Sequence, residues 1–427
     1  MLKPRQKPPA PYLGRTLNHE MRKKMATRTV FKNGTVFDGT SAGMADLVLE
    51  GRHVVDVGTD LDGDHVVDCS GMSVLPGLFD CHVHVMTRDF NLARAEQQAF
   101  SLQYYEAKRN LSLLLDQGIT SARDAAGADL GVKQAIAQEL IEGPRLQIAI
   151  SMLSQTGGHG DVHLPSGGNR SIPMMTAHPG RPNSIVDGPD GVRRGVREVL
   201  RAGADAVKIA TTGGVMSSGD NPRHAQFRAD ELAVIVAEAA AADTYVFAHA
   251  QGTEGIKAAL RAGVRSIEHG YYLDDEAVDL MLERGAWLVP TLSATRAIID
   301  AAESGIPIPD ENANLAREAV EAHKASFALA VQAGVKIAMG TDSPPYWSPA
   351  ASNLRELALM VNSSSMSALD AWRATTSSPA ELLGFDAAGK LAAGKLADVV
   401  VIAGSLSDLD DLRGRVRQVW LDGTQVR

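Results

Sequence analysis

Short apolar segments alternate with longer amphipathic segments through the middle of the chain. The amphipathic segments, such as DELAVIVAEAAAA and DDEAVDLMLERG, have helical periodicity, and several end on a glycine such as Gly263 or Gly285. The apolar segments have strand length and span residues 78–84, 119–124, 145–151, 204–210, 245–250, 266–270, 287–292 and 336–342. Strict alternation of strand and helix favours parallel β/α units, so eight of them predict an α/β protein with a (β/α)8 TIM-like barrel.

The two ends of the chain have a different pattern. Residues 29–76 and 385–427 contain short alternating segments separated by turn dipeptides such as Asn-Gly and Asp-Gly, without helix-length periodicity. We expect these two segments to form one small β-sandwich domain, with the barrel, residues 77–384, inserted between them. Residues 1–28 are basic and contain prolines but lack the apolar core of a secretory signal, so we expect a flexible N-terminal arm.

Side chains that can bind a metal ion lie at the ends of several predicted strands. His82 and His84 are two residues apart and therefore point to the same face of a strand. Active sites of (β/α)8 barrels lie at the C-terminal ends of the strands, where side chains from different strands converge. The candidates are His82, His84, Lys208, His249, His269 and Asp342. Any one could be a satisfied core residue, but the aligned set predicts a site for zinc or a similar divalent ion.

Lys208 is the unusual member of this set. An ammonium group has only hydrogen-bond donors and cannot bind a cation. Carboxylation by CO2 would convert the amine into an anionic carbamate, whose two oxygens could bridge two metal ions. The alternatives are a neutral buried lysine and a lysine paired with a carboxylate.

The composition limits the classes of partner. The net charge is −9, and no run of Lys and Arg occurs beyond the N-terminus, so nucleic acid is not an expected partner. The longest apolar segments fall well short of the ~20 residues of a membrane span, so we expect a soluble protein without a membrane partner. Cys69 and Cys81 give no disulfide framework and suit a reducing cytoplasm. Cys81 alternates away from the two histidines, so we expect it to pack in the core.

As a set, the candidate ligands resemble those of the amidohydrolase superfamily, in their order and in their strand placement. Further stretches resemble its prolidase-like branch of metal-dependent dipeptidases and carboxypeptidases: TSARDAAG (120–127), SQTGGHGD (154–161), KIATTGGVMSSGD (208–220), IEHG (267–270) and GTDSP (340–344). The resemblance implies two divalent ions, expected to be zinc, with carboxylated Lys208 between them. It also implies that His159 is a catalytic, substrate-contacting histidine. Because Asp342 lies beside the expected metal-bound water, we expect it to be the catalytic acid and base. We expect a small-molecule substrate and a homo-oligomer.

One departure from that branch bears on the substrate. Its members commonly continue the fifth-strand histidine as His-Ala-Tyr, with the tyrosine available to a substrate carboxylate, whereas this chain has Gln251. An amide can still donate a hydrogen bond. Arg223, Arg228 and Tyr272 are further candidates for substrate binding, although surface arginines and a packing tyrosine are the alternatives.

The expected reaction is therefore hydrolysis of a peptide-type amide bond. The favoured substrate is a dipeptide or an N-acyl amino acid, as for an Xaa-Pro dipeptidase or carboxypeptidase. The alternative is a non-peptide amide, carbamate, lactam or ester, as for ochratoxin-type amidases or imidazolonepropionase-like enzymes.

Overall fold

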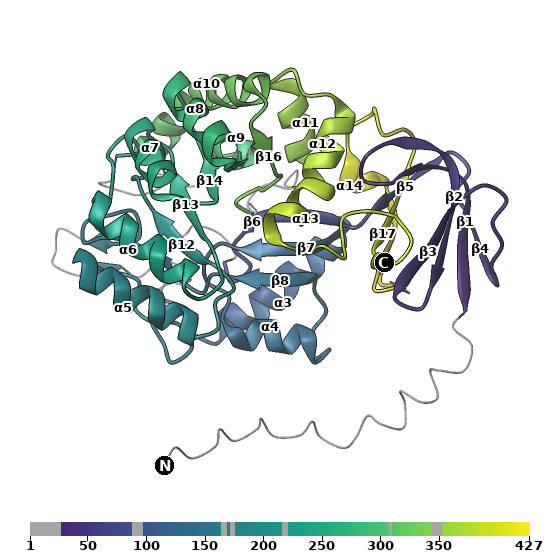
Figure 1. Cartoon of the computed structure of the whole chain (residues 1–427), viewed down its shortest axis with the longest axis horizontal. Coiled ribbons are helices and arrows are strands. Elements are labelled where there is room, and N and C mark those ends of the chain that lie inside the picture. The colour runs from purple at the N-terminus through teal and green to yellow at the C-terminus, as the bar shows by residue number, and fades with distance from the viewer. Residues whose placement is uncertain are drawn as a thin grey trace, which may run out of the picture.

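The computed structural model describes residues 27–87, 97–163, 169–170, 176–215, 221–306, 310–343 and 352–427. Helices and strands alternate through the middle of the chain, and a separate sheet formed by both ends lies at one side (Figure 1). Within the described ranges, no helix is long and apolar enough to cross a membrane. Residues 1–26 of the predicted arm lie outside these ranges, so the arm stays a prediction.

The central strands described by the structure form two parallel sheets. Their strand orders are β16-β15-β14-β13-β12-β9 and β6-β7-β8. The bounds are β6 (Leu78–Val83), β7 (Ile119–Asp124), β8 (Arg145–Ile148), β9 (Met152–Leu153), β12 (Val207–Ala210), β13 (Val246–Ala250), β14 (Ser266–His269), β15 (Trp287–Val289) and β16 (Lys336–Ile337). Backbone hydrogen bonds join the sheets, from Asp205 N to Ile148 O at one edge and from Cys81 N to Met339 O at the other.

Strands occur at every position where the sequence predicts one, but the segment at 145–151 is divided. Ile150 has a φ of 66°, which is an outlier conformation for a β-branched residue. The left-handed residue ends the ladder of β8, and the chain re-enters a sheet as β9, with Met152 opposite Lys208 of β12. A short antiparallel pair follows, formed by β10 (Val162–His163) and β11 (Asn169–Arg170).

The helices between the strands pack against the outside of the parallel sheets, as α5 to α8 do beside β12 to β14 (Figure 1). Gly263 and Gly285 end α7 and α8 with left-handed φ values of 97° and 62°, which confirms the predicted glycine stops. The bounds are α3 (Leu102–Leu115), α4 (Leu130–Ala137), α5 (Gly188–Arg201), α6 (Ala229–Ala240), α7 (Thr253–Ala262), α8 (Asp275–Arg284), α9 (Leu292–Glu303), α10 (Asp310–Ala333), α11 (Arg355–Asn362), α12 (Ala368–Thr375), α13 (Ser377–Leu383) and α14 (Leu412–Arg415).

Strands from both ends of the chain form one sheet with its own apolar core. The strands are β1 (Arg28–Phe37), β2 (Ala42–Glu50), β3 (His53–Gly58), β4 (His65–Asp68), β5 (Met72–Pro76), β17 (Val399–Ala403), β18 (Val416–Leu421) and β19 (Thr424–Gln425). The described strands of the predicted sandwich are hydrogen-bonded into one continuous sheet, because the long β1 pairs with β2 on one side and with both β4 and β5 on the other. The predicted domain boundaries themselves stay a prediction.

A buried ion pair joins this sheet to the parallel strands. Asp398 precedes β17, and its side chain is 2% exposed. Its Oδ1 accepts a hydrogen bond from Nη2 of Arg145 in β8 at 3.0 Å, and Arg145 also pairs with Asp422. These contacts therefore fix the C-terminal strands of the sheet to β8, at the edge of the parallel strands β6 to β8.

Candidate metal centre

Three predicted metal ligands meet where strand β6 lies beside the segment that follows β16. His82 belongs to β6, His84 follows it, and the backbone N–H of Asp342 donates to the carbonyl of His82 at 2.8 Å. Oδ1 of Asp342 lies 3.1 Å from Nε2 of His84 and 3.4 Å from Nε2 of His82. The ligand atoms of these three residues all lie within 4.8 Å of one another, so they form a candidate site for one divalent ion.

Two further predicted ligands, His249 in β13 and His269 in β14, lie beside this group. The ring centroids of His82 and His269 are 5.0 Å apart, and those of His269 and His249 are 4.6 Å apart. Burial lowers the pKa of both His249 and His269 well below its usual value. Both imidazoles are therefore neutral near pH 7, which is the form that binds a metal ion.

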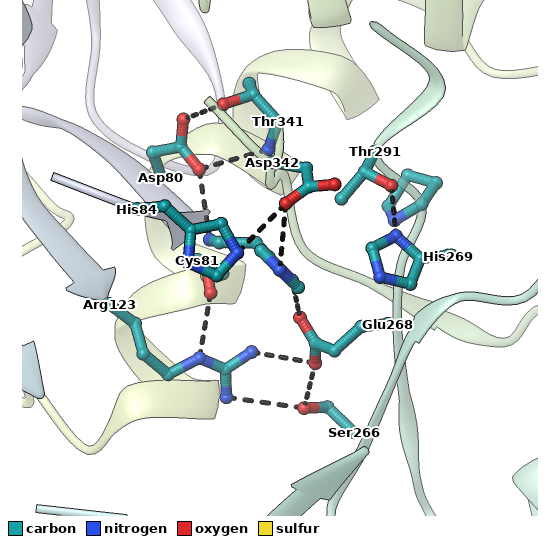
Figure 2. Close-up of polar contacts among 12 residues, drawn as sticks. Asp80, Cys81, His84, Arg123, Ser266, Glu268, His269, Thr291, Thr341 and Asp342 are labelled. Atoms are coloured by element: carbon teal, nitrogen blue, oxygen red, sulfur yellow. Dashed lines mark hydrogen bonds and ion pairs between the residues drawn. The ribbon is translucent and has the colours of Figure 1, made fainter. Parts of the chain in front are cut away.

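In His84, His249 and His269, one ring nitrogen contacts a neighbouring oxygen atom, and this contact fixes the orientation of the ring. Nδ1 of His269 is 2.7 Å from Oγ1 of Thr291, and Figure 2 shows this contact. Nδ1 of His84 is 3.0 Å from the carbonyl oxygen of Ala126. Nε2 of His249 is 2.9 Å from the carbonyl of Gly213. Metal-binding histidines are commonly held in this way, with one nitrogen anchored and the other available.

Two candidate ligands have left-handed backbone conformations. The φ value is 73° at His269 and 59° at Asp342. Such conformations are uncommon outside glycine, and they concentrate at functional sites where the surrounding structure maintains them. His269 is the last residue of β14, and Asp342 lies in the segment that follows β16.

Lys208 lies in β12, and its side chain is buried next to Phe247, with Nζ 5.0 Å from the ring centroid. Among the described residues, Nζ has no hydrogen-bond partner and no ion pair, so the lysine–carboxylate pair left open by the sequence is not observed. Burial lowers the pKa of Lys208 to about 8. This shift increases the share of neutral amine, the nucleophilic form that reacts with CO2. A buried amine without a partner, beside neutral imidazoles, fits the predicted bridging carbamate.

Two groups that the sequence did not single out support the ligands. Asp80, fully buried in β6, accepts hydrogen bonds from the backbone N–H groups of His82 and Thr341 at 3.0 and 3.1 Å, and from Nδ2 of Asn353 at 2.7 Å. It therefore ties the strand of His82 to the segment of Asp342 (Figure 2).

The second group is the pair of Arg123 and Glu268, from β7 and β14. Burial favours the neutral acid, but the charge of Arg123 and the hydrogen bond from His82 together lower the pKa of Glu268 to about 2. The sequence signal that marks this pair is an arginine and a glutamate inside two of the predicted parallel strands, ITSARD and SIEH.

His159 lies beside the second part of the centre. Its ring stacks on that of His249, with centroids 4.0 Å apart and planes inclined by 14°. A Cβ added to Gly214 would lie 2.3 Å from Cε1 of His159, so the ring is seated directly against that glycine. The backbone N–H of His159 donates to Oε1 of Gln226 at 3.0 Å. The structure thus places His159 next to the predicted ligands.

Three of the predicted substrate-binding residues form one cluster. The backbone N–H of Tyr272 donates to the carbonyl of Gln251 at 2.9 Å, and Cζ of Arg223 lies 4.2 Å from the centroid of the Tyr272 ring. The side-chain oxygen of Gln251 is buried without a hydrogen-bond partner in the part of the chain that the structure describes. Arg228 is exposed at the start of α6 and has no described contact with this cluster.

Together, the parallel strands and the strand-end imidazoles and carboxylate define a candidate hydrolytic metal centre. The amidohydrolase family model matches residues 73–426, and the chain belongs to that family. The family resemblance noted from the sequence is thereby confirmed, and with it the broad class of hydrolase.

Several characterised proteins are similar over nearly the whole chain. Ochratoxinase of Aspergillus niger is 35% identical over 412 residues, which are 90% of this chain and 83% of that protein. The crystal structure of a prolidase complexed with N-methylphosphonate-L-proline is 35% identical, with a TM-score of 0.83, over 94% of this chain and 100% of that one. An Xaa-Pro dipeptidase with methionine bound in its active site is 30% identical, with the same TM-score and coverage.

Proposed function

We propose that this protein is a binuclear metal-dependent amidohydrolase whose two parallel sheets close into a single (β/α)8 barrel. The proposal rests on the convergence of four imidazoles, a carboxylate and a buried, unpartnered lysine amine at one end of the parallel strands. His82, His84 and Asp342 would hold one ion. His249 and His269 would hold the other, with carboxylated Lys208 between them; the nitrogen-rich donor set favours zinc.

When bound, such ions polarise a scissile carbonyl and lower the pKa of water. The chain's own residues supply the proton transfers. The Asp342 side chain is 23% exposed, so it can reach both a water molecule and a substrate. In our proposal its carboxylate accepts the proton of the attacking water and delivers it to the leaving nitrogen. His159, stacked on His249, stabilises the developing oxyanion or a substrate carboxylate.

We propose a dipeptide or an N-acyl amino acid as the substrate, with proline or another apolar residue on the leaving side. The similarity to the prolidase complex and to the Xaa-Pro dipeptidase supports this choice. The guanidinium of Arg223 stacks on the ring of Tyr272. It is the cation that would bind the substrate carboxylate in place of the tyrosine that Gln251 replaces.

A neutral amide, carbamate, lactam or ester is the second candidate. The uncharged amide of Gln251 favours it, because a neutral donor holds a carboxylate less tightly than an ionised one. The similarity to ochratoxinase is compatible with this alternative.

Comparison of kcat/KM for an N-acyl amino acid and for its carboxamide separates the two candidates. A site built around a carboxylate should prefer the free acid by at least about tenfold, because a hydrogen bond to a charged group contributes about 1.5–3 kcal/mol. Arg223→Met should abolish that preference, whereas Arg228→Met should preserve it. Equal rates on both compounds in the unaltered protein would reject the carboxylate-directed assignment.

A further inference from the structure

Beneath the metal centre lies an ion pair without solvent contact. The side chains of Arg123 and Glu268 are both 0% exposed, and Nη2 of Arg123 donates to Oε1 of Glu268 at 2.8 Å (Figure 2). Arg123 also donates from Nε to the carbonyl of Cys81 at 2.8 Å, and its Cζ lies 3.9 Å from the centroid of the Phe247 ring. The guanidinium is therefore held by residues of β6, β13 and β14, from both parallel sheets.

The second carboxylate oxygen of Glu268 contacts a candidate ligand directly. Oε2 lies 2.7 Å from Nδ1 of His82, while Oε1 also accepts a hydrogen bond from Oγ of Ser266 at 2.7 Å. A carboxylate can only accept hydrogen bonds, so the ring proton of His82 must lie on Nδ1. The lone pair of Nε2 is then directed toward Asp342, where the first ion would bind.

Stability alone does not explain this pair. Two charges removed from water cost more free energy than their attraction usually returns, and apolar side chains of similar volume often replace such pairs without loss. Carboxylates that orient a metal-binding histidine have a functional reason to be buried, because they fix its tautomer and raise its basicity.

We propose that Glu268 is a positioning residue for His82 and that Arg123 in turn positions Glu268. The inference rests on the proposed metal-dependent function. The pair does not touch the substrate, and its effect is on the affinity of the ion held by His82, His84 and Asp342.

Zinc titration of the metal-free protein, in competition with a chromophoric chelator, tests this role without measuring catalysis. The unaltered protein should bind two ions. Glu268→Gln should weaken one of the two sites by about 10- to 100-fold and leave the other within about threefold of its original affinity. Asp398→Asn is the matched control, because it neutralises another buried carboxylate paired with an arginine, far from the histidines. That control should lower the unfolding temperature without changing zinc affinity.

The double variant Arg123→Met/Glu268→Gln covers the case in which a single variant does not fold, since it removes both charges together. It should unfold at a higher temperature than Arg123→Met alone, yet show the same weakened zinc site as Glu268→Gln. Full zinc affinity at both sites in the double variant would overturn the inference and leave the proposed function intact. Failure of the unaltered protein to bind zinc would overturn both.

Discussion

Gly214→Ala tests whether His159 acts from its position on His249. The backbone of Gly214 lies outside the left-handed region, so alanine introduces no conformational strain there. The new Cβ would lie 2.3 Å from Cε1 and 2.8 Å from Nδ1 of His159. Carbon atoms in contact are normally about 3.5 Å or more apart, so the ring must move by roughly 1 Å.

A displacement of about 1 Å at a group that contacts the reacting atoms can cost about 10²-fold in rate. We therefore expect kcat/KM to fall by about that factor. The ring of His159 is only half-buried, so the unfolding temperature should change little. Gly43→Ala is the matched control, because nothing lies within 4 Å of its added Cβ and its backbone is also outside the left-handed region.

Steady-state kinetics on zinc-loaded proteins of equal metal content provide the measurement. If the loss passes through His159, Gly214→Ala should have little further effect in a His159→Ala background, because the group that it displaces is already absent. Near-normal turnover in Gly214→Ala, or an undiminished loss in that background, would refute the reasoning.

Three further predictions concern the metal centre and the surrounding core. Lys208→Ala should lose bound metal and activity together, with partial recovery of both on addition of a short carboxylic acid; elemental analysis and turnover measure this, and full metal content without the lysine contradicts it. Asp342→Asn should keep most of its metal but lose about 10²- to 10⁴-fold in kcat, as expected for a general acid and base; unchanged kcat removes Asp342 from that role. Burial raises the pKa of Glu356 from 4.5 to about 7, so the folded state binds this proton more tightly than the unfolded state. The resulting stability is fully present below pH 4.5 and is lost as the pH rises through about 7, by up to about 3 kcal/mol. Urea unfolding of the metal-free protein should show that Glu356→Gln does not lose this stability as the pH rises. If the free energy of unfolding has the same pH dependence in both proteins, the raised pKa of Glu356 is contradicted.

The order of the elements and the candidate ligands could be predicted from local pattern. Strand-length apolar segments and left-handed glycines such as Gly263 act within a few residues, so the sequence displays them directly. His82 and His84 were recognisable because the two-residue period of a strand fixes their common face, and the same alternation correctly predicted that Cys81 packs in the core beside Phe79.

The division of the third expected strand was not predictable from apolar pattern. RLQIAIS is continuous in its hydrophobicity, but Ile150 adopts a left-handed conformation that ends β8. Tertiary packing overrides local preference there, because the chain must leave one sheet and enter the other beside β12. The single continuous sheet at the chain ends was likewise decided by the pairing of β1 with partners distant in sequence.

The supports of the metal centre were decided by tertiary structure alone. Arg123 and Glu268 are 145 residues apart, and nothing in either strand specifies that they meet or that His82 completes the network. The contact between His159 and Gly214 depends in the same way on two segments distant in sequence, one after β9 and one after β12. The sequence by itself determined which side chains could bind metal ions, because that depends on chemistry and on local period. Only the fold decided which nitrogen of each ring is available, because that depends on neighbours brought together across the sheets.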